Sequence, residues 1–290
     1  MDIKEALAGI GRGVIEARKR AGVQGVMAAD GMEHCATCGE PLMLALNFNG
    51  AIAEQLGSTR YVPRNCQCMR DMFAREEAAG EERKRKRIID SARIEGIPEE
   101  KWRKNTFAAD DGRNVKVRRM CEKYVAKWEE MIDGNFGLAF VGANEGGKTF
   151  WASCIANALI DAGASVLMTT IPQLISEIAD NYGEDREYTL RRIRNVQFLI
   201  IDDFGFERDS GFAMEKAFEI INTRYNAGKP LIVTANLTVD ALKNPKDMSY
   251  SRIYSRVVEM CPALVEIEGK RRQELAVQKR RQLLEALKGE

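Results

Sequence analysis

The sequence lacks any apolar run long enough to cross a membrane. A membrane helix needs about 20 consecutive apolar residues, and no run of that length occurs among the 290 residues. The first ten residues, MDIKEALAGI, also lack the apolar core of a secretion signal. A composition of 45% hydrophobic and 30% charged residues is that of a soluble globular protein. Seven cysteines, four in two close pairs and three scattered, fit a reducing compartment better than a disulfide framework, so we expect a cytoplasmic protein with no membrane partner.

An excess of charge of one sign is absent too. The 44 lysines and arginines nearly balance the 43 aspartates and glutamates, so the total charge neither favours nor excludes a nucleic-acid partner. Internal repeats and low-complexity tracts are also lacking. The length allows one large domain and a smaller one. We predict a small N-terminal domain over residues 1–70, a charged helical linker over 71–104 and a large domain over 105–290.

Histidine is nearly absent, whereas cysteine is well represented. Four cysteines form two close pairs, Cys35-x2-Cys38 and Cys66-x-Cys68. Such pairs suit tetrahedral Zn²⁺ because each pair forms a turn that chelates the metal from one side, and a small domain with little core needs such a staple. We therefore predict a zinc site, with unrelated cytosolic cysteines as the alternative and His34 as a weaker substitute ligand. The remaining cysteines are expected to be buried core thiols: Cys121, Cys154 and Cys261.

Two helices are predicted outside the large domain. Residues 3–20 form an amphipathic pattern, with an apolar face made of Ile3, Leu7, Ile10 and Val14. This pattern contains three interior glycines, each of which costs about 1 kcal/mol, so the helix needs a partner surface, either its own domain or another protein. Residues 70–93 are rich in charges of both signs and predict a solvated helical connector, and Pro98 favours the start of the next helix.

Beyond residue 105 the pattern changes to apolar strands that alternate with helices. The expected strands are Leu138–Val141, Ser165–Thr169, Gln197–Ile201 and Pro230–Thr234. The expected helices are Thr149–Asp161, Phe212–Asn226 and a basic helix from Lys270. This alternation predicts an α/β fold, in which helices cover both faces of a parallel sheet.

A phosphate-binding pattern, GxxxxGK[ST], occurs between an expected strand and an expected helix as GANEGGKT, Gly142–Thr149. In such a loop the backbone N–H groups point at the phosphates of ATP, Lys148 neutralises their charge, and the hydroxyl of Thr149 ligates Mg²⁺. The residues expected to bind the nucleotide are Gly142, Asn144, Gly146, Gly147, Lys148 and Thr149.

Glu145 places a negative charge within this loop. Its side chain can point to solvent because the backbone, not the side chains, faces the phosphates. Repulsion across ~8 Å of water is only about 0.5 kcal/mol. ATP should therefore bind with somewhat reduced affinity, and Glu145→Gly should tighten binding modestly.

Two aspartates, Asp202 and Asp203, follow the apolar strand residues FLII. Ligands of open α/β sheets lie beyond the carboxyl ends of the strands, so we expect Asp202 to hold Mg²⁺ and Asp203 to orient or deprotonate the attacking water. Asn236 ends the next strand and is a candidate to hold that water, although a lone asparagine there is usually a turn residue.

Arg252 and Arg256 lie four residues apart in SRIYSRVVEM, on one helical face. An exposed, rigidly mounted arginine of this kind can serve the γ-phosphate of a neighbouring subunit. The alternative is a surface arginine paired with an acid such as Glu259. The segment Gly269–Arg272 places further arginines after this helix.

Five separated motifs in this order, GANEGGKT, LIIDDFG, RYNAGKPLIVTANL, SRIYSRV and EGKRR, resemble the AAA+ helicase loaders of the DnaC/DnaI type and their relatives, the IstB-like transposition helper ATPases. The resemblance runs from about Asn105 to Arg272. It implies that Lys148 and Thr149 belong to Walker A, Asp202 and Asp203 to Walker B, Asn236 to sensor 1, Arg256 to the arginine finger, and Arg272, or its neighbour Arg271, to sensor 2.

The resemblance also implies partners. Loaders carry an extra helical element, here Pro172–Arg194, that steers single-stranded DNA, and Arg191, Arg192 and Arg194 would contact phosphates. Some loaders bind a hexameric replicative helicase through a cysteine-rich N-terminal module and assemble into a spiral or hexamer with ATP and helicase or DNA. Glu145 in place of the usual glycine is one departure from the family pattern. Asp-Asp in place of the Asp-Glu of many AAA+ proteins, a pair common among loaders, favours slow hydrolysis because aspartate is one methylene shorter, and we expect DNA or a partner to stimulate it.

Three functions are compatible with these features. The leading one is an ATP-dependent loader of a replicative helicase, with ATP as a switch. The second is a transposition helper that acts on duplex DNA. The third, from a different class, is an adaptor whose degenerate AAA+ domain works without nucleotide.

Overall fold

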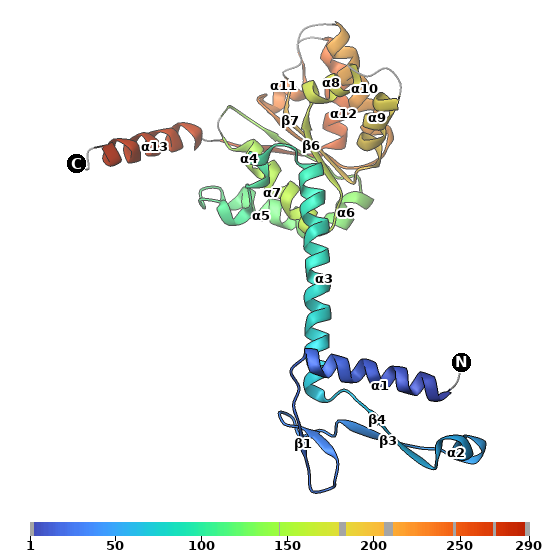
Figure 1. Cartoon of the computed structure of the whole chain (residues 1–290). Helices are drawn as coiled ribbons and strands as arrows, with labels where there is room; N and C mark the ends of the chain where they lie inside the picture. Colours follow the sequence, from blue (N-terminus) through green and yellow to red (C-terminus); the bar gives the residue numbers. More distant parts are fainter. Residues whose placement is uncertain are drawn as a thin grey trace. The chain divides into compact units, whose positions relative to one another are not determined.

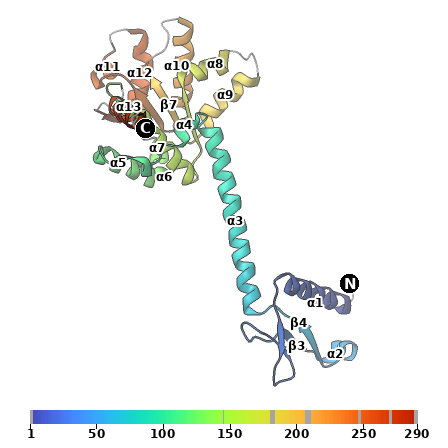
Figure 2. The same ribbon diagram turned by 60° about the vertical axis from the view of Figure 1, so that its left-hand side comes forward.

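A computed structural model describes residues 3–144, 146–179, 184–205, 211–245, 248–268 and 271–287. The chain divides into two compact units, Met1–Lys86 and Arg87–Glu290, whose elements are labelled in Figures 1 and 2. Within the described ranges, no helix has the length and apolarity required of a membrane span.

The N-terminal unit contains two antiparallel strand pairs where the sequence shows little regular pattern. The pairs are β1 (Gly25–Met27) with β2 (Glu33–Cys35), and β3 (Met43–Asn47) with β4 (Thr59–Pro63). The helices are α1 (Ile3–Arg20), α2 (Gly50–Leu56) and the first part of α3 (Gln67–Gly96). Three of the strands could not be read from apolar alternation, because few of their side chains are buried.

Helix α1 packs on its own unit. A Cβ added to Gly11 would lie 3.3 Å from Cδ of Pro63, and the guanidinium of Arg18 donates to the carbonyl of Leu42 and, at 3.4 Å, to the carboxylate of Glu33. The contact face therefore includes a glycine and an arginine, and Ile10, which we expected on that face, is 65% exposed. The expectation was wrong at Ile10 because apolarity alone defined the face.

The C-terminal unit is built on a five-stranded parallel sheet, as predicted, in the order β6-β7-β8-β5-β9. The strands are β5 (Leu138–Val141), β6 (Val166–Thr170), β7 (Phe198–Phe204), β8 (Leu231–Ala235) and β9 (Ala263–Glu266). The first four match the expected strands to within a few residues. The edge strand β9 was not predicted, since its side chains are half-buried or exposed and its sequence, ALVE, has only three apolar residues in a row.

Helices cover both faces of this sheet (Figure 1). One core contains side chains of α5 (Val115–Ala126) and α7 (Lys148–Asp161). The other contains side chains of α8 (Ile171–Ala179), α9 (Glu184–Asn195), α10 (Gly211–Asn226), α11 (Val239–Lys243) and α12 (Met248–Met260). Alternation along the strands divides them between the cores, so Phe140 packs on the first side and Val141 on the second. The remaining helices are α4 (Glu100–Arg103), the 3-10 turn Phe107–Ala109, α6 (Trp128–Asp133) and α13 (Arg271–Leu287).

Helix α3 ends where it meets the sheet. A Cβ on Gly96 would lie 2.3 Å from the carbonyl oxygen of Val166 in β6, so only glycine allows this approach. The next helix, α4, begins at Glu100, two residues later than the start that Pro98 suggested. The C-terminal turn of α3 therefore lies against the edge strand of the sheet.

Candidate functional site

The phosphate-binding loop connects β5 to α7. Gly147 is the N-cap of α7 and has a left-handed backbone, with φ of 92°, which glycine adopts without strain. Lys148 is buried, and its Nζ donates to the carbonyls of Gly142 at 2.9 Å and Ala143 at 2.7 Å. Asn144 is exposed, and Glu145 lies outside the described residues. The lysine thus lies over the loop at the N-terminus of a helix, where anions are favoured.

The backbone residues that follow β9 and β8 pack against this loop. Gly142 has φ of 124°, and a Cβ there would lie 2.6 Å from the carbonyl oxygen of Ile267. A Cβ on Gly146 would lie 2.9 Å from the same oxygen. The N–H of Gly142 also donates to the carbonyl of Leu237 at 2.9 Å. The loop residues fit a Mg²⁺-nucleotide, because a loop without Cβ atoms at these points keeps its N–H groups facing one concavity.

The two aspartates lie at the carboxyl end of β7 and differ in environment. Asp202 is 8% exposed and accepts a hydrogen bond from Oγ1 of Thr234 at 2.6 Å. Asp203 is exposed, has φ of 57°, and lies at an irregularity in the β7–β8 pairing. Nδ2 of Asn236 donates to its Oδ1 at 2.7 Å. The structure therefore brings together three residues that the sequence analysis placed at one site.

Thr234 is a member of this group that sequence reasoning missed. Its hydroxyl oxygen also accepts from the backbone N–H of Asp203 at 2.9 Å, so one hydroxyl orders both aspartates. The only signal in the sequence is a polar residue inside an otherwise apolar strand, LIVTA. A left-handed aspartate costs of order 1–3 kcal/mol and persists where its surroundings over-determine it, as Thr234 and Asn236 do here.

The guanidinium of Arg256 packs against two aromatic rings. Its guanidinium carbon is 4.5 Å from the ring centre of Phe218 and 5.4 Å from that of Tyr225, both in α10. The Tyr225 hydroxyl donates to Glu259 at 2.7 Å, and this hydrogen bond to Glu259 raises the pKa of Tyr225. Arg252 is exposed on the same helix, α12. The side chain of Arg272 lies outside the part of the chain that the structure describes, so its role stays a prediction.

The expected extra helical element corresponds to the helix pair α8 and α9, which pack on each other. Residues 180–183, between them, lie outside the described ranges. The arginines are in the second half of α9: Arg191 is exposed, Arg192 lies 3.5 Å from Glu177, and Arg194 lies 3.9 Å from Glu187.

The four paired cysteines converge in the N-terminal unit. Their Sγ atoms, in Cys35, Cys38, Cys66 and Cys68, all lie within 4.8 Å of one another. Hydrogen bonds from the backbone of Cys68 and Glu40 lower the pKa of Cys38 to about 6, which favours a thiolate. Four sulfurs in one cluster are the donor set of a structural zinc site, and the residues fit Zn²⁺.

His34 has other partners. Its Nδ1 lies 2.8 Å from the carbonyl oxygen of Gly39, and its Nε2 lies 2.8 Å from a carboxylate oxygen of Asp30. Both hydrogen bonds raise the pKa of His34. The ring is therefore held beside the cysteine cluster by the protein itself.

The sheet order, the glycine loop and the acidic pair define a P-loop ATPase fold of the AAA+ class. The sequence model of the family described as "IstB-like ATP binding protein" matches residues 59–274. The chain belongs to this IstB/DnaC-like family, as the motifs predicted.

Three similar proteins illustrate the relationship. The replicative helicase loader DnaC of Escherichia coli (strain K12) is 28% identical over 120 residues, which are 40% of this chain and 49% of DnaC. A putative insertion sequence ATP-binding protein, y4pL, of Sinorhizobium fredii (strain NBRC 101917 / NGR234) is 32% identical over 113 residues, 39% of this chain and 46% of that protein. The crystal structure of the DnaC helicase loader matches with a TM-score of 0.50 and 25% identity, over 59% of this chain and 100% of that one. The chain spans about half the length of the two curated relatives.

Proposed function

We propose that this protein is an ATP-dependent loader of a replicative DNA helicase. The observation that carries the proposal is a glycine loop closed by Lys148, together with an acidic pair at the end of β7 that Thr234 and Asn236 hold by hydrogen bonds, in a chain that is similar to DnaC over 120 residues. ATP binding would act as a switch, and hydrolysis would be slow and stimulated by DNA or a partner.

In this proposal the nucleotide chemistry is divided among few residues. Lys148 and the loop N–H groups bind the phosphates, while Thr149 and Asp202 hold Mg²⁺, which supplies charge neutralisation when bound. Asp203, fixed by Asn236, orients or deprotonates the attacking water. Arg256 serves the nucleotide of the next subunit, for which the aromatic rings beneath it supply a rigid mount. Arg272 would complete the site as sensor 2.

The N-terminal unit is the proposed helicase-binding part. The four cysteines would hold Zn²⁺, which would cross-link this unit. The unit needs such a cross-link because its buried cluster contains only four residues among those described. Its strands expose large apolar side chains, namely Val26, Met27, Leu44 and Tyr61, which suits a protein partner. We retain residues 1–70 as this domain, 71–104 as a linker and 105–290 as the ATPase domain.

The AAA+ domain would bind single-stranded DNA through α9 and assemble into a spiral or hexamer when ATP and helicase or DNA are bound. Arginines on one helix supply phosphate contacts whose strength falls with salt. Of the three arginines, Arg191 has no ion pair among the described residues.

A transposition helper is the second candidate. The similarity to the insertion sequence ATP-binding protein favours it, and it predicts binding to duplex DNA. The nucleotide-independent adaptor is the third candidate, and it predicts that Lys148→Ala leaves function unchanged.

Co-purification of the full chain with its host's hexameric helicase tests the proposal. Met27→Ser with Tyr61→Ser should abolish co-purification without changing ATP affinity, because both side chains are exposed and remote in sequence from the nucleotide loop. Phe136→Ser, which changes an exposed side chain of the C-terminal unit, is the matched control. Failure of the native chain to retain the helicase, together with tight binding to duplex DNA, would favour the transposition candidate.

A further inference from the structure

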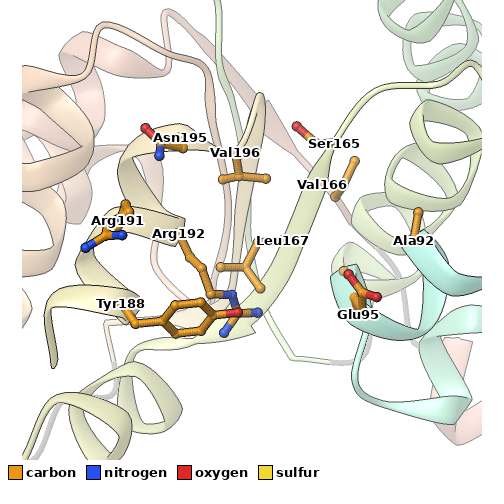
Figure 3. A pocket seen from close by; sticks show the side chains of 11 residues that line it. Ala92, Glu95, Ser165, Val166, Leu167, Tyr188, Arg191, Arg192, Asn195 and Val196 are labelled. Carbon is orange, nitrogen blue, oxygen red and sulfur yellow. The ribbon is translucent and has the colours of Figure 1, made fainter. Parts of the chain in front are cut away.

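A cleft of about 440 Å³ opens at the edge of the sheet, between the last turns of α3 and the second half of α9 (Figure 3). Its floor is the start of β6, with Val166 and Leu167, and Ala92 and Glu95 form the α3 wall. The opposite wall comes from α9 and includes Tyr188, Arg191, Arg192 and Asn195.

The cleft is separate from the nucleotide site. Its floor residue Val166 pairs with Phe198, the first residue of β7, whereas Asp202 lies four residues further on. Four residues of strand span roughly 13 Å, so the cleft lies at the amino end of the strands and the phosphate loop at their carboxyl end. A ligand of the cleft would therefore be bound in addition to ATP.

An aromatic ring and a guanidinium form one side of this cleft. Tyr188 is 59% exposed, and the guanidinium carbon of Arg192 lies 5.8 Å from the centre of its ring. Val166 and Leu167 are buried and make the floor apolar. In Figure 3 the ring and the Arg192 head extend below Leu167, opposite Glu95. A flat π-surface above an apolar floor suits a planar heterocycle.

The charges of the cleft are polarised. Arg191 and Arg192 lie on the α9 side. Of these two, Arg192 has an acidic partner, Glu177 at 3.5 Å, and Arg191 has none among the described residues. Glu95 lies on the α3 side, where its carboxylate accepts from Ser91 at 3.2 Å. A phosphodiester backbone is attracted to the first wall and repelled by the second, and the carboxylate can accept from an N–H group of a base.

We propose that this cleft holds one unpaired base of single-stranded DNA, stacked on Tyr188, while Arg191 and Arg192 bind the adjoining phosphates. The proposal rests on the single-strand binding proposed above and assigns it a base-binding site. It also predicts a preference for single strands, because the bases of a duplex are already stacked and paired. Binding should be tolerant of sequence, since every base has a π-face.

The test uses the full chain with a non-hydrolysable ATP analogue and a fluorescently labelled oligothymidylate, followed by fluorescence anisotropy. Tyr188→Ala should weaken binding about ten-fold, as expected for the loss of one base stack, whereas Tyr188→Phe should retain it. Phe136→Ala, at an exposed aromatic side chain of the C-terminal unit that lies outside the cleft, should bind as the native chain does. An oligonucleotide of abasic sites should bind more weakly and should no longer distinguish Tyr188→Ala from the native chain.

The outcomes separate the two proposals. Equal binding of the native chain and Tyr188→Ala to the oligothymidylate overturns the base site and leaves single-strand binding intact. The base site is also overturned if Tyr188→Ala binds DNA normally and loses only helicase binding, because the cleft would then hold a protein partner. If the native chain binds no single strand at all, the proposed DNA-binding function fails, and the base site fails with it.

Discussion

Single residues of the nucleotide site were readable from the sequence where their neighbours along the chain define them. Lys148 and Asp202 lie in local motifs, and each stands where its motif placed it. Thr234 and Ile267 were not readable, because each acts on residues far away along the chain: the hydroxyl of Thr234 orders the acidic pair, and the carbonyl of Ile267 crowds the glycine loop.

Gly146 should tolerate no side chain. In Gly146→Ser the new Cβ would lie 2.9 Å from the carbonyl oxygen of Ile267 and 3.2 Å from its Cγ2, so the loop must shift. Overpacking of this kind costs about 1–3 kcal/mol, and ATP should bind about ten-fold more weakly by calorimetry. Gly211→Ser is the control, since a Cβ there meets nothing within 4 Å. Unchanged affinity of Gly146→Ser would contradict the crowding argument.

Thr234→Val should slow hydrolysis while leaving ATP binding nearly unchanged. The substitution keeps the shape but removes the hydroxyl that donates to Asp202 and accepts from the N–H of Asp203. A hydrogen bond to a charged group contributes about 1.5–3 kcal/mol, so kcat should fall at least about ten-fold. Thr169→Val, in the buried part of β6, should hydrolyse ATP at the native rate. Equal kcat values for the two variants would exclude the positioning role of Thr234.

At the scale of elements, the C-terminal end of α9 is held by cations from another segment. The guanidinium of the fully buried Arg224 donates to the carbonyls of Ile193 at 3.0 Å and Val196 at 2.7 Å. Nζ of Lys229 donates to the carbonyl of Asn195 at 2.7 Å. Both cations lie in RYNAGKP, which the sequence analysis used only as a motif, and they satisfy carbonyls that a helix end leaves unpaired.

Arg224→Met should destabilise the fold strongly. The variant keeps the apolar stem but leaves buried carbonyls without a donor, which should lower the free energy of unfolding by about 3 kcal/mol. Lys229→Met removes a single bond of a more exposed residue and should cost less than about 1 kcal/mol. Urea unfolding followed by circular dichroism measures both. The capping account is wrong if the two variants are equally stable.

Strands were predictable from the sequence where both of their faces are buried. Strands β5 to β8 carry continuous apolar runs because helices cover both faces of the sheet, and those runs were visible in the sequence. The strands β1, β3 and β4 bury few of their side chains, so their hydrogen-bonded pairing left no apolar signal. The cysteine pairs were the only chemical indication of order in that region.

At the scale of the whole molecule, the two units differ in what stabilises them. The C-terminal unit has two large cores, one on each face of its sheet. The N-terminal unit has a buried cluster of Cys35, Leu42, Cys66 and Met69, and two of these four are proposed metal ligands. Folding of the smaller unit should therefore be linked to metal binding.

Removal of zinc should unfold the N-terminal unit alone. We expect about one Zn²⁺ per chain by mass spectrometry of the metal, and a chelator should release it and abolish helicase binding. ATP affinity should stay unchanged, because the nucleotide site lies in the other unit. Cys38→Ser should lower the zinc content, whereas Cys121→Ser, in the core of the C-terminal unit, should not. Purified chain without metal would refute the zinc assignment.

The most direct measurement of the central claim is the transfer of the host's hexameric helicase onto circular single-stranded DNA, followed as DNA-bound helicase. The native chain should increase DNA-bound helicase when ATP is present, and Lys148→Ala should not, because it lacks the charge that holds the phosphates. Equal transfer by the two proteins, or no transfer by either, would contradict an ATP-switched loader.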